Sequence, residues 1–369
     1  MRKQKSIQAI KNPSPLIKPP TSYLDHDDFL PTVGIFTCPS NINQGAVPFA
    51  GNHGFFSEIF QFLRKQGMIC YVFLADGIHE NGIKGYYYSD NRWNKSNFPF
   101  PNVIYNRVPS RNYEKSNEFS EVVTFCRERD IPFFNPRFVD KYEMNELLID
   151  TPILTPYLPQ TLLYTNEQDL LESLKKWGKI YVKPVSGKRG EGIFTLEESK
   201  NGILYQDYKK IRTYLSIEQF ITNSDFLTSR GYILQKAIEP KTLRGNRYDY
   251  RVLVHSRSSD GFKVSAVSVR MAMEQQLTTH NHLGGKAISY NRVKNSDLEY
   301  QFNVIASEIG RQLSQRIGFF GEFTIDVGED EKDQLHIFEV NVKPMQFTER
   351  SIERIRYEQL SILFKSLSK

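Results

Sequence analysis

The sequence lacks the features of exported, disulfide-bonded and membrane-spanning proteins. Only three of its 369 residues are cysteines, Cys38, Cys70 and Cys126, and they form no CxxC pair. An odd number of widely spaced cysteines indicates reduced core thiols of a cytoplasmic protein. No apolar run approaches the roughly 18–20 residues of a membrane span, and no apolar signal segment follows the basic N-terminus. We therefore expect neither export nor membrane insertion.

Acidic residues are absent from residues 1–24, which supply five of the six net positive charges. The rest of the chain is nearly neutral, whereas nucleic-acid-binding proteins concentrate basic charge on a folded domain. The composition therefore does not support nucleic-acid binding. Five prolines between Pro13 and Pro31 break helices and strands alike. They predict an extended tail over residues 1–30.

The remaining chain is long enough for two or three packed domains. Between residues 31 and 137, short apolar strands alternate with helical segments, which predicts a small α/β domain with parallel strands. This domain has no phosphate-binding loop of its own. A proline-marked connection, TPILTPYLPQT, lies in the part that follows, where strands and helices are mixed. We take this connection as a domain boundary. The α/β domain is thus followed by a second region over residues 138–369.

A basic, glycine-rich stretch, YVKPVSGKRGEGIFTL, is the most informative part of the sequence. Strand geometry places Lys183 on the face opposite Val182, and the chain then turns through Gly187, Gly190 and Gly192. Glycines let backbone N–H groups approach phosphates closely, and the basic side chains add positive charge. The pattern predicts a flexible hairpin that covers phosphates, although the loop alone also fits a solvated hairpin with a basic tip.

Two C-terminal strands, GEFTIDVG and QLHIFEVNVKP, alternate apolar and polar residues. The apolar positions are expected to face the core: Phe323, Ile325, Val327, Phe338, Val340 and Val342. Asp326, Glu339 and Asn341 would then face one common space. Oxygen ligands of this kind suit Mg²⁺, and Mn²⁺ as well. A polar face that is merely hydrated is the alternative.

Arginines mark the two preceding long strands. GNRYDYRVLVHS places Asp249 and Arg251 on one strand face, and Arg270 follows one strand later. The planar, permanently charged guanidinium suits a phosphoryl group, but an Asp249–Arg251 network without a ligand fits equally well. His280 and His282 follow in a polar loop without a third His or Cys nearby, so zinc is not predicted.

The strand YILQKAI is a candidate for nucleobase binding. It could present the backbone groups of Lys236–Ile238 to the edge of an adenine ring, with apolar neighbours around the ring. Taken alone, the pattern favours a simple buried strand.

These motifs occur in the order Lys141, YVKPVSGKRGEG, LQKAI, DYRVLV, SVRMA, a double glycine, TIDV and FEVNVKP, and this order resembles the ATP-grasp superfamily. Together with YNRVPSR and PFFNPRFVDKYEMNELL, they resemble the YheC/YheD endospore coat-associated proteins over about residues 32–350. The resemblance implies an ATP-grasp fold, α/β and α+β, with two α+β lobes preceded by a Rossmann-like pre-ATP-grasp domain. The small lid lobe would span about residues 160–238 and the C-terminal lobe about residues 239–369.

The resemblance also implies roles for individual residues. The phosphate-binding set would be Lys141, Lys183, Ser186, Gly187, Lys188, Arg189, Gly190 and Gly192. The adenine hinge would be Gln235, Lys236, Ala237 and Ile238, and the metal ligands Asp326, Glu339 and Asn341. The catalytic set would be Arg251, Arg270, Asp249 and Asn281. Relatives that ligate amino acids often carry an asparagine four residues before the double glycine, where this chain has His280.

The activity implied by the resemblance is an ATP- and Mg²⁺-dependent ligase that joins a carboxylate to an amine or thiol through an acyl-phosphate. The substrate would be a small molecule or peptide that carries a carboxylate. The alternative is a structural or assembly protein of the spore coat that binds ATP without ligation, or not at all, with the basic tail as a candidate arm for docking to coat proteins. A cytoplasmic location is expected, and association with the spore coat is implied by the resemblance alone.

Overall fold

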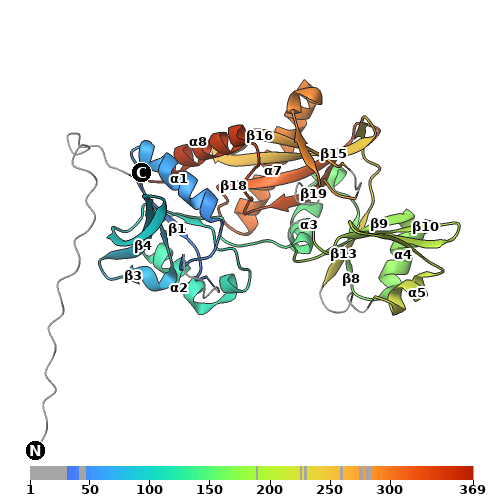
Figure 1. Cartoon of the computed structure of the whole chain (residues 1–369), viewed down its shortest axis with the longest axis horizontal. Coiled ribbons are helices and arrows are strands. Elements are labelled where there is room, and N and C mark those ends of the chain that lie inside the picture. The colour runs from blue at the N-terminus through green and yellow to red at the C-terminus, as the bar shows by residue number, and fades with distance from the viewer. Residues whose placement is uncertain are drawn as a thin grey trace, which may run out of the picture. The chain divides into compact units, whose positions relative to one another are not determined.

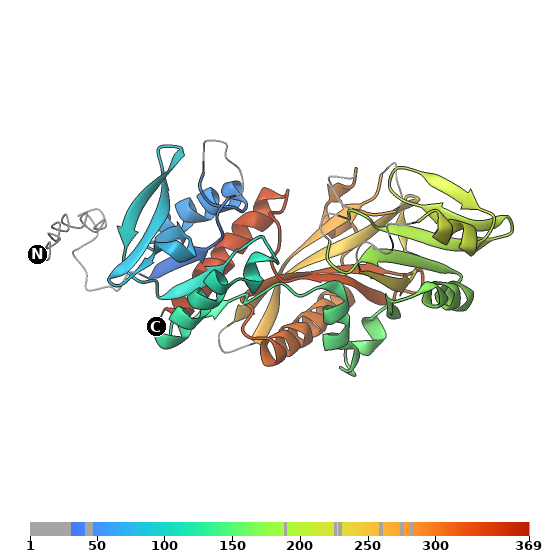
Figure 2. The same ribbon diagram turned by 90° about the horizontal axis from the view of Figure 1, so that it is seen from below.

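The computed structural model describes residues 31–40, 47–187, 190–224, 227, 231–257, 261–273, 277–279 and 284–368. The chain divides into two compact units, residues 1–133 with 367–369, and residues 134–366, which are described separately (Figures 1 and 2). The predicted tail and the candidate site residues Lys188, Arg189 and Asn281 lie outside the described residues. In the described part of the chain, no helix has the length and apolar character needed to cross a membrane.

The first unit is built on a sheet whose described strands are ordered β3-β4-β2-β1-β6-β7, with β5 paired to β4. The strands are β1 (Thr32–Phe36), β2 (Ile69–Phe73), β3 (Ile78–His79), β4 (Gly82–Ser89), β5 (Arg92–Phe98), β6 (Val103–Asn106) and β7 (Phe133–Phe134). Strand β1 runs parallel to both β2 and β6, as the alternating pattern predicted. Helices α1 (His53–Lys65) and α2 (Asn117–Glu128) connect these strands. The Rossmann-like assignment of this unit stays a prediction.

The antiparallel hairpin of β4 and β5 was not predicted from the sequence. Its two strands join at Asp90 and Asn91, whose φ angles are 51° and 58°. A two-residue turn with both φ angles positive matches the twist of a hairpin, and Asp and Asn tolerate this conformation better than most residues. The Asp-Asn pair between two aromatic strands was therefore an available signal.

The second unit begins with a lid lobe whose sheet has the order β12-β11-β10-β9-β13-β8 in the described residues. Its elements are β8 (Thr161–Tyr164), α4 (Glu167–Trp177), β9 (Lys179–Pro184), β10 (Phe194–Ser199), β11 (Gly202–Gln206), β12 (Ile211–Tyr214), α5 (Ile217–Thr222) and β13 (Tyr232–Lys236). Ile180 and Val182 of β9 enter the lobe's core together with Leu170 of α4. Because strand residues alternate, Tyr181 and Lys183 lie on the opposite face of the sheet.

The C-terminal lobe contains a second antiparallel sheet, ordered β17-β16-β15-β18-β19 with β14 paired to β15 in the described chain. Its elements, with the connecting α3, are α3 (Lys141–Ile149), β14 (Thr242–Leu243), β15 (Asn246–Arg257), β16 (Gly261–Met271), β17 (Lys286–Ile288), α7 (Ser296–Arg316), β18 (Glu322–Glu329), β19 (Leu335–Asn341) and α8 (Arg350–Leu367). Tyr250 and Val252 of β15 pack with Phe302 of α7 in one core. The alternate residues of β15 therefore face away from α7.

Helix α7 starts earlier than the sequence pattern predicted. The spacing of apolar residues in the sequence predicts a helix over 303–317, whereas the helix begins at Ser296. The side chain of Asn295 accepts a hydrogen bond from the backbone N–H of Leu298 at 2.8 Å, which caps the first turn. The cap explains the extra turns, because it satisfies N–H groups that have no partner inside the helix.

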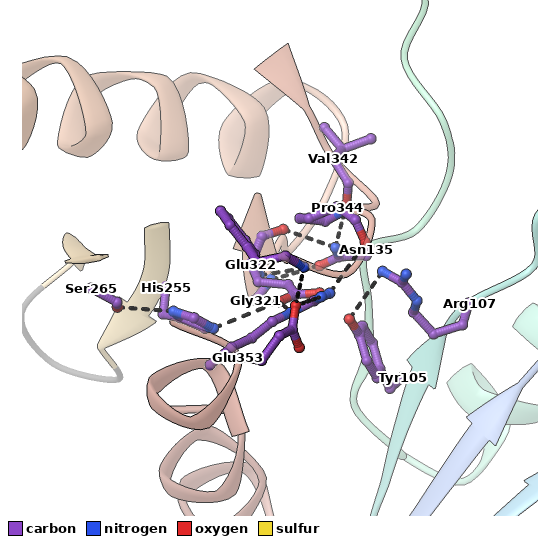
Figure 3. Close-up of polar contacts among 12 residues, drawn as sticks. Tyr105, Arg107, Asn135, His255, Ser265, Gly321, Glu322, Val342, Pro344 and Glu353 are labelled. Atoms are coloured by element: carbon purple, nitrogen blue, oxygen red, sulfur yellow. Dashed lines mark hydrogen bonds and ion pairs between the residues drawn. The ribbon is translucent and has the colours of Figure 1, made fainter. Parts of the chain in front are cut away.

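A buried polar cluster fixes one end of the antiparallel β18–β19 pair, where β18 starts and β19 finishes (Figure 3). Asn135 is fully buried with a positive φ of 56°. Its side-chain amide donates to the carbonyl oxygens of Glu322, at 2.9 Å, and Val342, and its oxygen accepts from the N–H of Gly321 at 2.9 Å. One side chain therefore joins the start of β18 to the residue that follows Asn341.

Arg356 of α8 belongs to the same cluster, because it binds the side chain of Glu322. Its Nε and Nη2 donate to the two carboxylate oxygens of Glu322 at 2.8 and 2.6 Å, and both side chains are fully buried. The same guanidinium donates to the carbonyl oxygens of Pro344 at 3.3 Å and Met345 at 3.4 Å. Hydrogen bonds from Arg356 of α8 and from Asn135 thus both hold the segment that follows β19.

Candidate functional site

Lys183 lies on the face of the lid sheet that points away from the lid core. Its Nζ donates to the side-chain oxygen of Gln235 on the neighbouring strand β13, at 2.5 Å. The same Nζ lies 5.4 Å from the ring centre of Tyr181 and 5.9 Å from that of Phe338 on β19. Phe338 is the residue before Glu339. Its contact with Lys183 therefore places the ammonium beside the C-terminal lobe.

The charges around Lys183 show which groups share this space. Burial lowers the pKa of Lys183 to about 8, the carboxylate of Glu339 opposes that change, and Lys141 and Arg247 add to it. The carboxylate of Asp326 also raises the pKa of Lys183. Charges influence a pKa in this way only at short range. The predicted phosphate-binding lysines and two predicted metal-binding carboxylates therefore converge.

The two carboxylates lie in one row of the C-terminal sheet. Asp326 on β18 is paired in register with Glu339 on β19 and with Arg251 on β15. Asn341 lies one row further along, opposite Thr324. These side chains share one face because residues at alternate positions of neighbouring strands point the same way.

Lys141 joins the acidic row to the lid. It is the first residue of α3, and its Nζ lies 3.2 Å from Oε1 of Glu339. Its backbone N–H donates to the carbonyl oxygen of Val185, just after β9, at 3.2 Å. The first turn of α3 is therefore anchored to the strand that carries Lys183.

Both predicted arginines contact Asp326. Arg251 binds it in bidentate fashion, Nε to Oδ1 at 2.9 Å and Nη2 to Oδ2 at 2.8 Å. Arg270 places Nη2 3.1 Å from Oδ2 of Asp326 and also binds Asp249 in bidentate fashion, at 2.8 and 2.9 Å. The hydroxyl of Thr279 donates to Asp249. Within the described residues, Nη1 of Arg270 is buried without a hydrogen-bond partner.

The alternative network, an Asp249–Arg251 pair without a ligand, is not what forms. The register of β15 and β16 sets Asp249 opposite Arg270, whereas Asp249 and Arg251 are two residues apart on one strand. Each arginine therefore finds a carboxylate on a neighbouring strand. Asp249 orients Arg270, and Arg270 in turn contacts Asp326.

The oxygen atoms of Asp326, Glu339 and Asn341 are of the type that binds a hard divalent cation. Two carboxylates and one amide are the ligand types that Mg²⁺ prefers when phosphates complete its coordination. Among the residues the structure describes, no group of three or more His, Cys, Asp or Glu side chains could hold a metal ion. A cation here would therefore depend on Asn341 and on the oxygens of a bound nucleotide.

The predicted flap and hinge are only partly described. Gly190 and Gly192 have φ angles of 70° and 75°, in the region that favours glycine. At the hinge, the N–H of Lys236 donates to the carbonyl of Gln160 and that of Ala237 to the carbonyl of Lys179, at 2.9 and 3.1 Å. An adenine would therefore have the N–H of Ile238 and the backbone carbonyls as its partners.

The prediction that Phe338 faces the core is wrong. The pairing of β18 and β19 shifts between Asp326 and Val327, so Ile337 takes the core position and Phe338 is only partly buried. The ring of Phe338 instead lies over Gly328, where a Cβ would come within 2.2 Å of it. A bulge adds one residue to one strand and reverses the faces beyond it, and strict alternation cannot reveal this.

Arg247 lies near Lys183 and was not predicted from the sequence as a candidate residue. Its Nη1 donates to the hydroxyl of Tyr181 at 2.5 Å and to the carbonyl of Leu277 at 3.2 Å, which links β15 to β9. The signal was present, because Arg247 shares a strand face with Asp249 and Arg251 by alternation.

Comparison with known proteins identifies the family of the chain. A family model described as YheC/D like ATP-grasp matches residues 130–365. The chain is 28% identical over 330 residues to the endospore coat-associated protein YheD of Bacillus subtilis (strain 168), covering 85% of this chain and 72% of that protein.

Two solved structures show the same fold at low sequence identity. The D-Ala:D-Ser ligase VanG of Enterococcus faecalis matches with a TM-score of 0.56 at 10% identity, covering 92% of this chain and 100% of that one. The ATP-grasp ligase PsnB, solved with its minimal precursor, Mg and ADP, matches with a TM-score of 0.50 at 14% identity, covering 90% and 98%. The chain belongs to the YheC/D-like ATP-grasp family.

Proposed function

We propose that this chain is an ATP- and Mg²⁺-dependent ligase that joins a carboxylate to an amine or thiol through an acyl-phosphate. The observation that carries the proposal is the convergence of Lys141 and Lys183 with the row Arg251, Asp326 and Glu339. Two lysines beside a pair of carboxylates suit a triphosphate. The lysines would balance part of its negative charge, and a cation held by the carboxylates would balance the rest. The fold is also that of known ATP-grasp ligases.

The proposed reaction needs no side-chain nucleophile. An oxygen of the substrate carboxylate attacks the γ-phosphorus, the bond to the β-phosphate oxygen breaks, and ADP leaves. The acceptor then attacks the acyl carbon, the C–O bond to phosphate breaks, and inorganic phosphate leaves. The enzyme contributes positioning and charge stabilisation, the terms that dominate phosphoryl transfer.

Each residue of the site has a role in this scheme. Lys141 and Lys183 would bind the phosphates, and Arg251 and Arg270 would stabilise the charge on the transferred phosphoryl group. Asp249 would hold Arg270 in place. Asp326, Glu339 and Asn341 would hold Mg²⁺, which neutralises phosphate charge and polarises the phosphoryl oxygens when bound.

The second candidate is a spore-coat protein that binds ATP without ligation, or not at all. The observation in its favour is the name of the relative in Bacillus subtilis, an endospore coat-associated protein. The two candidates differ in one measurable property, because only a ligase releases ADP in response to a carboxylate.

A screen for ADP release tests the proposal. Amino acids, short peptides and cell-wall fragments would be tested with ATP and Mg²⁺, and mass spectrometry would identify the products. We expect at least one carboxylate to stimulate ADP release and to gain mass in the product. Nucleotide-dependent thermal stabilisation without ADP release from any carboxylate would favour the second candidate.

Lys183 is expected to make nucleotide affinity fall above about pH 8. Its pKa of about 8 means that the ammonium is charged below this pH and progressively neutral above it. Phosphates bind the charged form, so metal-free ADP affinity should approach a tenfold loss per unit above about pH 8. Calorimetric titrations with ADP from about pH 6.5 to 9.5 would measure this dependence.

The Lys183→Met variant is the control for this titration. Methionine is a long, unbranched side chain that can lie beside the rings of Tyr181 and Phe338 but carries no charge. We expect metal-free ADP to bind at least about tenfold more weakly at pH 7, with the slope above pH 8 lost. Wild-type affinity in this variant would reject Lys183 as a phosphate ligand.

A further inference from the structure

The segment that precedes α8 lies over the polar face of the C-terminal sheet. Phe347 of this segment and Ile352 in the first turn of α8 pack against Leu253 on β15. Leu253 is two residues from Arg251, so both side chains point to the same face. The segment therefore covers the sheet row directly beside the proposed site of phosphoryl transfer.

Glu349 reaches from this segment to strand β16. Ser268, which is opposite Arg251 in the β15–β16 register, donates its hydroxyl hydrogen to Oε1 of Glu349. The hydroxyl of Thr348 donates to Oε2 at 2.9 Å. Both partners are neutral, and in the described chain no basic side chain forms an ion pair with Glu349. A partly buried carboxylate beside the site thus has no ion-pair partner among the residues that the structure describes.

Capping of α8 does not explain the orientation of this side chain. Glu349 precedes the helix, and its backbone carbonyl accepts from the N–H groups of Ile352 and Glu353, at 3.0 and 3.1 Å. Its carboxylate oxygens contact Ser268 and Thr348 instead. The Nε and Nη2 of Arg251, opposite Ser268 in the register, are both bound to Asp326. Each carboxylate oxygen of Glu349 can accept a further hydrogen bond.

A second polar group in the same region has no partner. The hydroxyl of Thr324 is buried, and within the described residues it makes no hydrogen bond. Thr324 lies between Leu253 and Asn341 in the sheet register, on the face that Phe347 and Ile352 cover. Buried polar groups without partners are rare, and a bound ligand is one of the groups that can satisfy them.

We propose that Glu349 binds the protonated amine of the acceptor substrate and that the acceptor is therefore an amine rather than a thiol. This inference rests on the proposed ligase function and names the class of its second substrate. An ammonium group matches a carboxylate that has no ion-pair partner in the described chain and can accept further hydrogen bonds, whereas a thiolate would be repelled by it. The hydroxyl of Thr324 is available to a second polar atom of the same acceptor.

The proposed step balances with an ammonium acceptor. The amine nitrogen forms a bond to the acyl carbon, and the C–O bond to phosphate breaks. Of the three hydrogens on the ammonium, one stays on the amide nitrogen, one leaves on the phosphate as hydrogen phosphate, and one passes to water. Glu349 holds and orients the nitrogen before attack, so it is a binding residue for the acceptor.

Competition between two nucleophiles tests this proposal. Hydroxylamine is a neutral nucleophile near pH 7 and traps the acyl-phosphate as a hydroxamate, whereas amino-acid amides offer a cationic amine without a carboxylate. The full chain would be incubated with ATP, Mg²⁺ and a pool of amino acids and dipeptides as carboxylate donors. Hydroxamate, amide product and ADP would be quantified for the wild type, Glu349→Gln and Glu358→Gln. Glu358 is the matched control because it is a glutamate of α8 paired with Arg354 on the exposed side of the helix.

We expect Glu349→Gln to lower the ratio of amide product to hydroxamate at least about tenfold, through a higher KM for the amine, because a charge-assisted contact is lost. Glu358→Gln should keep the wild-type ratio. A purely structural tether would reduce both products together, so an unchanged ratio in Glu349→Gln would overturn the proposal. Thioester formation with N-acetylcysteamine in preference to amide formation would also overturn it. If the wild type forms neither hydroxamate nor ADP, the ligase function itself fails, and this inference fails with it.

Discussion

Glu339→Gln is expected to reduce carboxylate-dependent ADP release by on the order of 10²–10³-fold, because it removes one of the two carboxylates that would hold Mg²⁺. Glutamine keeps the length of the side chain, and Glu339 is partly exposed, so the fold should survive. The Mg²⁺ concentration that gives half-maximal rate should rise. Steady-state rates across a Mg²⁺ titration would measure both effects.

The same variant has an opposite effect on nucleotide binding without metal. Glu339 lies beside Lys141 and Lys183, and its negative charge opposes a nearby polyphosphate. Metal-free ADP binding should therefore not weaken in Glu339→Gln, although turnover falls. Glu197→Gln is the matched control, since it removes a glutamate paired with Lys179 on the lid surface. Wild-type turnover in Glu339→Gln would show that the acidic row holds no metal.

Arg356→Met is expected to destabilise the second unit by about 3–5 kcal/mol, because it leaves the carboxylate of Glu322 buried without its partner. Methionine fills much of the volume but supplies no donor. The carbonyls of Pro344 and Met345 also lose a partner, so the segment after Asn341 should loosen. Urea unfolding should show a lower midpoint for this unit.

The two tryptophans allow this loss to be assigned to one unit. Trp93 lies in the first unit and Trp177 in the second, and the chain has no others. In a Trp93→Phe background, tryptophan fluorescence therefore follows the second unit. Arg354→Met on the exposed side of α8 is the control and should shift the midpoint far less. Equal shifts in the two variants would contradict a stabilising role for the buried pair.

The local features of the site could be predicted from the sequence. The alternation of apolar and polar residues in β15 and β18 predicted that Asp249, Arg251 and Asp326 lie on the polar faces of their strands. The apolar Val182 likewise predicted that Lys183, the next residue, points away from the core of the lid. These predictions depend only on the two-residue period of a strand. The resemblance to the ATP-grasp superfamily supplied their order, and the family match agrees with it.

Features that depend on register or distant contacts could not be predicted. Asp249 pairs with Arg270 because of how two strands align, and Phe338 left the core because of a bulge. Asn135 contacts Glu322 across 187 positions of sequence. No local pattern encodes these choices, because register and long-range contacts are set by the packing of the whole unit.

A crystal structure with a non-hydrolysable ATP analogue and Mn²⁺ tests the central claim most directly. The anomalous signal of manganese should lie among the oxygens of Asp326, Glu339 and Asn341, at about the 2.1 Å distance typical of hard octahedral cations. The terminal phosphates should lie within hydrogen-bonding distance of Lys141 and Lys183. A manganese site elsewhere in the chain, or a triphosphate that contacts neither lysine, would contradict the claim.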